Sequence, residues 1–263
     1  MVIVTVLVGL IVGALVGMSG IGGAILLLPV MIIVLKVPPL VAIGTDAVFA
    51  AMTKIGAATV HWRQKTVDFR LAALLGVGSI PGAIVGFSIL ARLQATFSDD
   101  IGVILERMIG VLLLIVPFVM VGQTFLERRR TARDRTGTQT PREPTVLRTV
   151  LIGLTGGLLV GLTAVGSGSI ILVLLLLAFR RSPTVLVGTD LVHAVALTGL
   201  TGAMHFVTLH SVDFELVGLL LIGSLPGAFI GARLSRRISP LKLRSALMVL
   251  LVCAGILLLT NSH

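Results

Sequence analysis

The chain has 263 residues, of which 56% are hydrophobic and only 12% are charged. Because soluble domains carry about one quarter charged residues, this composition excludes a soluble globular protein and predicts a chain embedded in a lipid bilayer. The formal net charge of +10 does not indicate nucleic-acid binding, since basic runs such as residues 128–130 directly follow an apolar segment, where positive residues set the orientation of membrane proteins.

The first apolar run, residues 2–35, is too long for one straight membrane span and too short for two spans with a loop. It is interrupted near its middle by Ser19-Gly20-Ile21-Gly22-Gly23. Glycine permits positive φ and offers no side chain for packing, so a helix can unwind or reverse there. The run is predicted to be either a re-entrant hairpin or a broken helix that crosses the membrane.

Three segments of spanning length follow, at residues 40–60, 69–91 and 103–125. Residues 126–147 are rich in arginine, contain two prolines and have no apolar face. We expect them to form a flexible cytoplasmic linker.

The second half repeats this order. A long apolar run at residues 148–179 is interrupted by small residues at 163–169, and spans are predicted at 184–206, 214–234 and 241–260.

Short motifs identify the two halves as copies of one unit, because Gly44-Thr45-Asp46 recurs as Gly188-Thr189-Asp190. The other matched positions are Gly9, Gly13 and Gly17 with Gly153, Gly157 and Gly161, Gly22 with Gly166, His61 with His205, 67–69 with 212–214, and 78–83 with 223–228. Membrane proteins built from two copies of one unit are most often transporters. The predicted fold is an all-α polytopic membrane protein with repeats at 1–125 and 148–263, each holding a glycine-broken or re-entrant helix pair and three spanning helices.

The distribution of arginine and lysine favours the re-entrant alternative. On that topology seventeen of the 21 basic residues lie on one side of the membrane, which the positive-inside rule assigns to the cytoplasm. The loops on that side are 61–70, 126–148, 180–183 and 233–244. Three crossings per repeat is an odd number, so the two repeats are predicted to be inverted, a plan in which the substrate site lies between them at the midplane.

Asp46 and Asp190 follow Gly-Thr near the start of a predicted span in each repeat. If they lie at a helix N-terminus, they cap free backbone N–H groups. If they lie deep in the membrane, they are candidates for proton coupling. Sequence leaves both interpretations open.

Lys54 is the one basic residue well inside a predicted span, and its counterpart in the second repeat is the neutral Thr198. An intramembrane cation usually needs an anion, either a bound substrate or Asp46 two helical turns earlier. The alternative is a lysine that extends its ammonium to the membrane surface without touching substrate.

The two glycine-rich interruptions are candidate anion sites, because unwound backbone and half-helix N-termini present N–H groups. Close helix packing by small residues is the alternative. The residues expected to bind substrate are Ser19, Gly20, Gly22, Gly23, Thr45, Lys54, Gly166, Ser167, Gly168 and Thr189.

Pro81 and Pro226 each lie within a predicted span, inside matching Gly-Ser-Ile/Leu-Pro-Gly segments, and are predicted hinges or points of close helix approach. His61 and His205 end the second span of each repeat, and Asp68 and Asp213 open the third. Interface anchoring and helix capping are expected for these four residues. No metal site and no cofactor are expected, since two ligands do not make a metal site.

An alternative hypothesis is an enzyme. Gly17-Met18-Ser19-Gly20 resembles the Gly-x-Ser-Gly motif of rhomboid intramembrane proteases, and His61 could act as the base. The second repeat has Gly161-Leu162-Thr163-Ala164 at the same place, so the repeat explains the segment as a helix break.

Together these motifs resemble the sulfite exporter TauE/SafE family, also called toluene-sulfonate-uptake permeases. The resemblance covers nearly the whole chain and rests on Gly20-Ile21-Gly22-Gly23, the segments 41–46 and 78–83, Thr53-Lys54, and Val67-Asp68. The second half departs from it, because it has no equivalent of Lys54.

The resemblance implies a multi-pass carrier in a bacterial cytoplasmic membrane that transports small sulfur-containing anions such as sulfite or organosulfonates. It also implies coupling to the proton motive force. The mechanism expected is alternating access between inverted repeats, with protons carried by Asp46 or Asp190. An anion channel is the alternative. The expected partners are a small anionic substrate and the lipid bilayer, with a homodimer left open and no nucleic acid.

Overall fold

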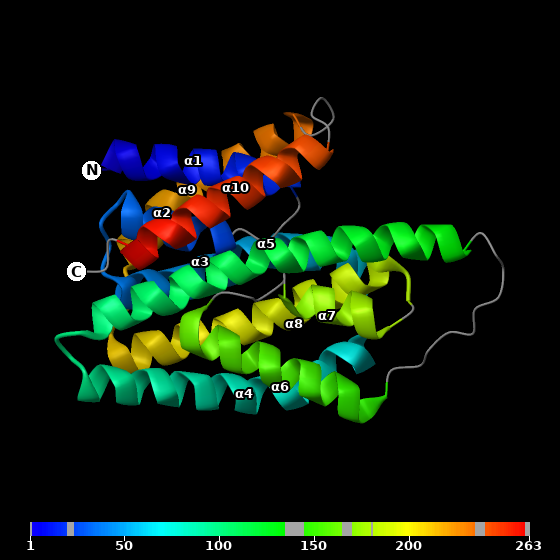
Figure 1. Cartoon of the computed structure of the whole chain (residues 1–263), viewed down its shortest axis with the longest axis horizontal. Coiled ribbons are helices and arrows are strands. Elements are labelled where there is room, and N and C mark those ends of the chain that lie inside the picture. The colour runs from blue at the N-terminus through cyan, green and yellow to red at the C-terminus, as the bar shows by residue number, and fades with distance from the viewer. Residues whose placement is uncertain are drawn as a thin grey trace.

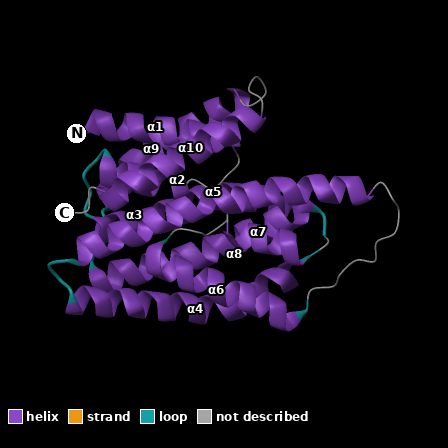
Figure 2. Cartoon of the chain, viewed as in Figure 1, coloured by secondary structure: helices purple, strands orange, loops and turns teal. Residues whose placement is uncertain are grey.

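The computed structural model describes residues 2–19, 24–134, 145–164, 170–179, 181–234 and 240–260. Within these ranges every regular element is a helix (Figure 2), as predicted. The elements are α1 (Val2–Ser19), α2 (Ala24–Ile33), α3 (Pro39–Arg63), α4 (Phe69–Thr96), α5 (Ile101–Asp134), α6 (Val146–Thr163), α7 (Ile170–Ala178), α8 (Pro183–Met204), the π-helical turn η1 (His205–Leu209), α9 (Phe214–Leu234) and α10 (Pro240–Thr260). Six of the described helical segments are long and apolar enough to cross a membrane.

Both long apolar runs are divided into two helices, which confirms that they are interrupted. In the first repeat α1 ends at Ser19 and α2 begins at Ala24, and in the second α6 ends at Thr163 and α7 begins at Ile170. Ala164 closes α6 in the left-handed conformation, with φ of 54°. Whether each pair re-enters or crosses stays a prediction.

The spans differ from the prediction at two places. Helix α6 has 18 residues and is long enough to cross on its own. The span expected at 241–260 agrees with the structure, since it is α10, a helix of 21 residues from Pro240 to Thr260. Helix α5 also continues to Asp134, past its expected end at residue 125.

The closest helix pairs each join one helix of the first repeat to one helix of the second. Helix α1 packs on α9 and helix α6 packs on α4, and these two pairs lie on opposite sides of the bundle (Figure 1). The first pair meets through glycines that contact backbone, namely Gly9 at Leu220, Gly13 at Ser224 and Gly17 at Ala228. Because both series of residue numbers rise together, α1 and α9 are parallel. Small residues allow the close backbone approach that membrane helices use in place of hydrophobic burial.

The second pair repeats this contact at equivalent positions, with Gly153 at Leu75, Gly157 at Ser79 and Gly161 at Ala83. Pro81 and Pro226 lie inside α4 and α9, the two helices that receive these glycines. Their segments are therefore points of close helix approach, one of the two roles expected. A hinge role stays a prediction.

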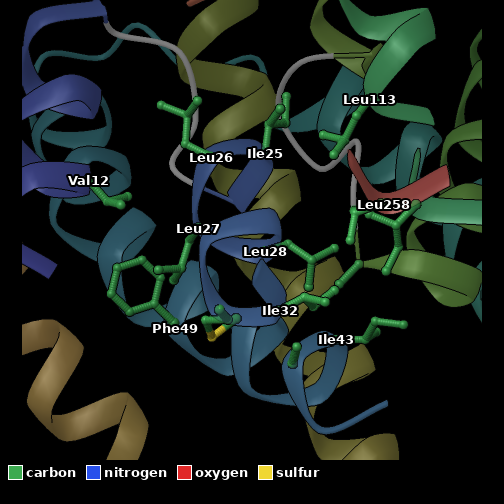
Figure 3. Close-up of a cluster of buried hydrophobic side chains, with 14 of the residues drawn as sticks. Val12, Ile25, Leu26, Leu27, Leu28, Ile32, Ile43, Phe49, Leu113 and Leu258 are labelled. Carbon is green, nitrogen blue, oxygen red and sulfur yellow. The ribbon is translucent and has the colours of Figure 1, made fainter. Parts of the chain in front are cut away.

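The short helix α2 is enclosed by its neighbours. Its side chains Ile25 to Leu28 and Ile32 are buried, and Figure 3 shows them surrounded by Val12, Phe49, Leu113 and Leu258. A helix that is apolar on all sides belongs in a core. Its counterpart α7 lies in a second core with α4, α6 and α8.

Two of the four basic loops that were predicted to share one membrane side, 61–70 and 180–183, are joined by an ion pair. Arg181 Nη1, just before α8, lies 2.7 Å from Asp68 Oδ2 at the start of α4. In Figure 1 the start of α1 and the end of α10 lie at one end of the bundle, and the end of α5 at Asp134 lies at the other.

Candidate functional site

Helices α3 and α8 occupy equivalent places in the two repeats and pack against each other in the middle of the bundle (Figure 1). A Cβ atom added at Gly44, near the start of α3, would lie 3.1 Å from the ring of His205, just after α8. One added at Gly188, near the start of α8, would lie 2.9 Å from His61 Nδ1, near the end of α3. The start of each helix therefore lies against the end of the other, so the two are antiparallel.

Thr45 and Thr189 form a reciprocal link between the repeats. Thr45 Oγ1 accepts a hydrogen bond from the backbone N–H of Asp213 (3.0 Å), and Thr189 Oγ1 accepts one from the N–H of Asp68 (2.9 Å). Thr189 also donates to the Val185 carbonyl (2.7 Å). Both hydroxyls hold α3 and α8 to the next helix of the opposite repeat, and their contact with substrate stays a prediction.

The expected capping by Asp68 and Asp213 is confirmed. The Oδ1 atom of Asp68 accepts a hydrogen bond from the Leu71 N–H (3.0 Å) at the start of α4, and Asp213 Oδ1 accepts one from the Leu216 N–H (2.9 Å) at the start of α9. Each satisfies one of the free donors at a helix N-terminus.

The two histidines at the ends of α3 and α8 hold the following loops. His61 Nδ1 lies 2.8 Å from Thr66 Oγ1, and His205 Nδ1 lies 2.8 Å from Ser211 Oγ. Among the residues that the structure describes, no three His, Cys, Asp or Glu side chains gather in a way that would hold a metal ion.

Asp46 and Asp190 do not cap a helix, so that interpretation is wrong. Helix α3 begins at Pro39 and α8 at Pro183, which places each aspartate seven residues into its helix, beyond the free N–H groups of the first turn. Both side chains are fully buried. Neither carboxylate oxygen of Asp46, nor Oδ1 of Asp190, has a hydrogen-bond partner among the described residues. Buried polar atoms normally have partners, so these two are candidate sites for a proton.

Lys54 belongs to the same buried group. Its side chain is 6% exposed, so it does not extend to the membrane surface, and that alternative is wrong. It interacts electrostatically with Asp190 of the opposite repeat and with Asp46 of its own helix. The cation thus interacts with one carboxyl group of each repeat, on the two helices α3 and α8 that pack together.

His193 is a further member of this group that sequence reasoning missed. It lies on α8 one turn after Asp190, is 4% exposed, and interacts electrostatically with Lys54. Its Nε2 atom lies 2.7 Å from Ser79 Oγ on α4. The sequence did contain a signal for His193: it lies inside an apolar span, at the position where the first repeat has the apolar Phe49.

Several expected substrate contacts lie outside the described residues. They are Gly20, Gly22, Gly23, Gly166, Ser167 and Gly168. Ser19 ends α1. The anion-binding role of the two interruptions stays a prediction.

Four side chains therefore define the candidate site in the described part of the chain: Asp46, Lys54, Asp190 and His193. It combines one ammonium, two carboxyl groups and an imidazole, all buried between apolar helices. Such groups inside a membrane protein are expensive to bury and mark paths of ions or protons. The arrangement can attract an anion to Lys54 while protons exchange at the carboxyl groups.

The sequence profile of the family described as Sulfite exporter TauE/SafE matches residues 5–258. The chain is 38% identical over 254 residues to "Probable membrane transporter protein YjnA" of Bacillus subtilis, an alignment that covers 97% of this chain and 98% of that protein. It is 24% identical over 254 residues to "Probable membrane transporter protein YdhB" of the same organism, with the same coverage of 97% and 98%. A "Probable membrane transporter protein" of Xylella fastidiosa is 27% identical over 241 residues, which cover 91% of this chain and 87% of that protein. No solved structure matches the chain.

Proposed function

Since the chain belongs to the Sulfite exporter TauE/SafE family, we propose that it transports small sulfur-containing anions, such as sulfite or organosulfonates, by proton-coupled alternating access. Its place is the cytoplasmic membrane of a bacterium. Its relatives are named as membrane transporters and not as proteases, so the chain is not an enzyme and the protease reading of Ser19 is set aside.

The observation that carries the proposal is the buried Lys54, which interacts electrostatically with Asp46 and with Asp190. A substrate anion beside Lys54 competes with the carboxylates for the same cation. Protonation of a carboxyl group removes its negative charge, so the Lys54 ammonium is free to bind the substrate anion. When the carboxyl group loses its proton again, the ammonium interacts with the aspartate and no longer with the substrate. Binding of the anion and binding of a proton are then linked, which is the requirement for coupled transport.

Inverted repeats are part of the proposal. The antiparallel packing of α3 on α8 supports them, because equivalent helices related by a two-fold axis in the membrane plane run in opposite directions. The reciprocal bonds of Thr45 and Thr189 support the same relation. The site then lies on the axis, where rocking of one repeat against the other opens it to each side in turn.

The orientation is tested with two cysteines at matching positions of the repeats. Gln64 and Thr208 are both exposed, and Cys253 is the one native cysteine. In a Cys253→Ala background we expect Thr208→Cys to react with a membrane-impermeant maleimide in intact cells. We expect Gln64→Cys to react only after permeabilisation. Reaction of both from the same side would contradict inverted repeats.

The transport activity is tested by uptake of ³⁵S-sulfite into liposomes that contain the purified protein. We expect uptake that saturates with sulfite, depends on an imposed proton gradient, and stops when a protonophore is added. An excess of acetate, a carboxylate without sulfur, is the control competitor. Uptake that does not saturate and ignores the proton gradient would indicate a channel, and absence of uptake for sulfite and organosulfonates would contradict the proposal.

A further inference from the structure

Two buried titratable residues of α3 and α8 have no titratable counterpart in the other repeat. Lys54 has Thr198 as its counterpart, and His193 has Phe49. The two exceptions lie in opposite repeats, yet they interact electrostatically with each other in the folded chain. The buried group is therefore asymmetric at one end, although the aspartates beside it are a matched pair.

His193 is held by one ring nitrogen only. Its Nε2 atom lies 2.7 Å from Ser79 Oγ, whereas its Nδ1 atom is buried and has no hydrogen-bond partner among the described residues. Leaving a buried ring nitrogen without a partner is costly. A hydrogen-bonding group that reached Nδ1 would remove this cost.

Ser79 is itself fixed by packing. Its backbone contacts Gly157 where α6 crosses α4, so its hydroxyl has a defined place relative to α8. When the hydroxyl donates to Nε2, the ring proton lies on Nδ1, and the histidine presents an N–H donor to the site.

We propose that His193 binds the transported oxyanion through Nδ1, beside Lys54, and that Ser79 is the positioning residue that orients its ring. The inference rests on the proposed function and adds to it a second donor, contributed by the second repeat. An ammonium and an imidazole N–H hold two oxygens of one small oxyanion.

The matching serine of the other repeat does not do this. Among the described residues, Ser224 Oγ donates to the Leu221 carbonyl of its own helix, at 3.5 Å. The residue equivalent to His193 is the apolar Phe49, which packs in the core (Figure 3). Ser224 is therefore a control position that differs from Ser79 in this one contact.

The test compares two substitutions of His193, to Asn and to Gln, whose amide groups each replace a different ring nitrogen. The amide of Asn places its nitrogen near Nδ1, whereas that of Gln places it near Nε2. If Nδ1 contacts the anion, His193→Gln should raise the KM for sulfite uptake about tenfold or more, the effect of losing a hydrogen bond to a charged group, and His193→Asn should raise it less. Ser79→Ala should raise KM while kcat changes little, and Ser224→Ala should leave both unchanged.

Unfolding temperatures of the purified variants show that each is folded. A His193→Gln protein that takes up sulfite with the parental KM overturns this inference and leaves the proposed function standing. The reverse order, in which Gln keeps the parental KM and Asn does not, also overturns it, because only the contact with Ser79 would then matter. A parental protein that takes up neither sulfite nor an organosulfonate overturns the proposed function and this inference with it.

Discussion

Lys54→Met is expected to reduce sulfite uptake to that of empty liposomes. The substitution keeps a long flexible side chain but removes the cation that interacts electrostatically with Asp46 and Asp190. Breaking a buried ion pair by removing one partner costs about 3–5 kcal/mol of stability. Uptake and the unfolding temperature are measured on the same preparation, so that loss of transport is read only from folded protein.

Two further variants separate charge from stability. Lys54→Met combined with Asp190→Asn removes one carboxylate with the cation and should regain part of the lost stability without regaining uptake. Thr198→Val, at the counterpart of Lys54, removes a hydroxyl that bonds its own helix at the Ala194 carbonyl and should transport like the parental protein. Parental uptake by a folded Lys54→Met variant would contradict the mechanism.

Gly157→Leu is expected to prevent assembly of a stable protein. A Cβ atom at this position would lie 2.6 Å from Ser79 Cα and closer still to the carbonyl of that residue. Backbone atoms cannot rotate away as a side chain can. The loss of folding stability should therefore exceed about 1–3 kcal/mol, which is usual for overpacking. The yield of monodisperse protein and its unfolding temperature measure the effect.

Gly218→Ala is the matched control, on helix α9 at a position where an added Cβ meets nothing within 4 Å. Alanine stabilises a helix interior by roughly 0.5–1 kcal/mol over glycine, so this variant should unfold at the parental temperature or above. A Gly157→Leu protein as stable as Gly218→Ala would show that α4 and α6 are not in close contact.

The sequence predicted the repeat and its interruptions but not the partner of each helix. Gly9, Gly13 and Gly17 were read as markers of the repeat, and the same spacing of four residues also defines a face for close packing. Such a face predicts that another helix packs closely against it, but it does not predict which helix. Pairing of α1 with α9, across the two repeats, is decided by tertiary packing that no local pattern records.

The site was predicted in part. Lys54 and the two aspartates were identified as candidates, and of the two interpretations left open for Asp46 and Asp190 the structure excludes capping, because each lies seven residues after the start of its helix. Pro39 and Pro183 mark these two helix starts in the sequence, since proline is favoured in the first turn. They put both aspartates well inside their helices.

His193 was missed because it belongs to no motif that the two repeats share, and Phe49 stands at the matching position. The residues that differ between copies, Lys54 against Thr198 and His193 against Phe49, are the ones that give the buried group its asymmetry. The same comparison that set Lys54 against Thr198 also sets His193 against Phe49, and it would have added this histidine to the candidates.

Because α1 packs on α9 and α4 packs on α6, the two pairs form at different times during synthesis. Helix α4 meets α6 soon after it is made, since only α5 and the linker separate them. Helix α1 must remain in the membrane without α9 until most of the chain has followed, a wait of about 10–40 s at ordinary rates of translation. During that interval its glycine face is open to lipid and to other nascent helices, so this first helix is where a membrane chaperone would be needed most.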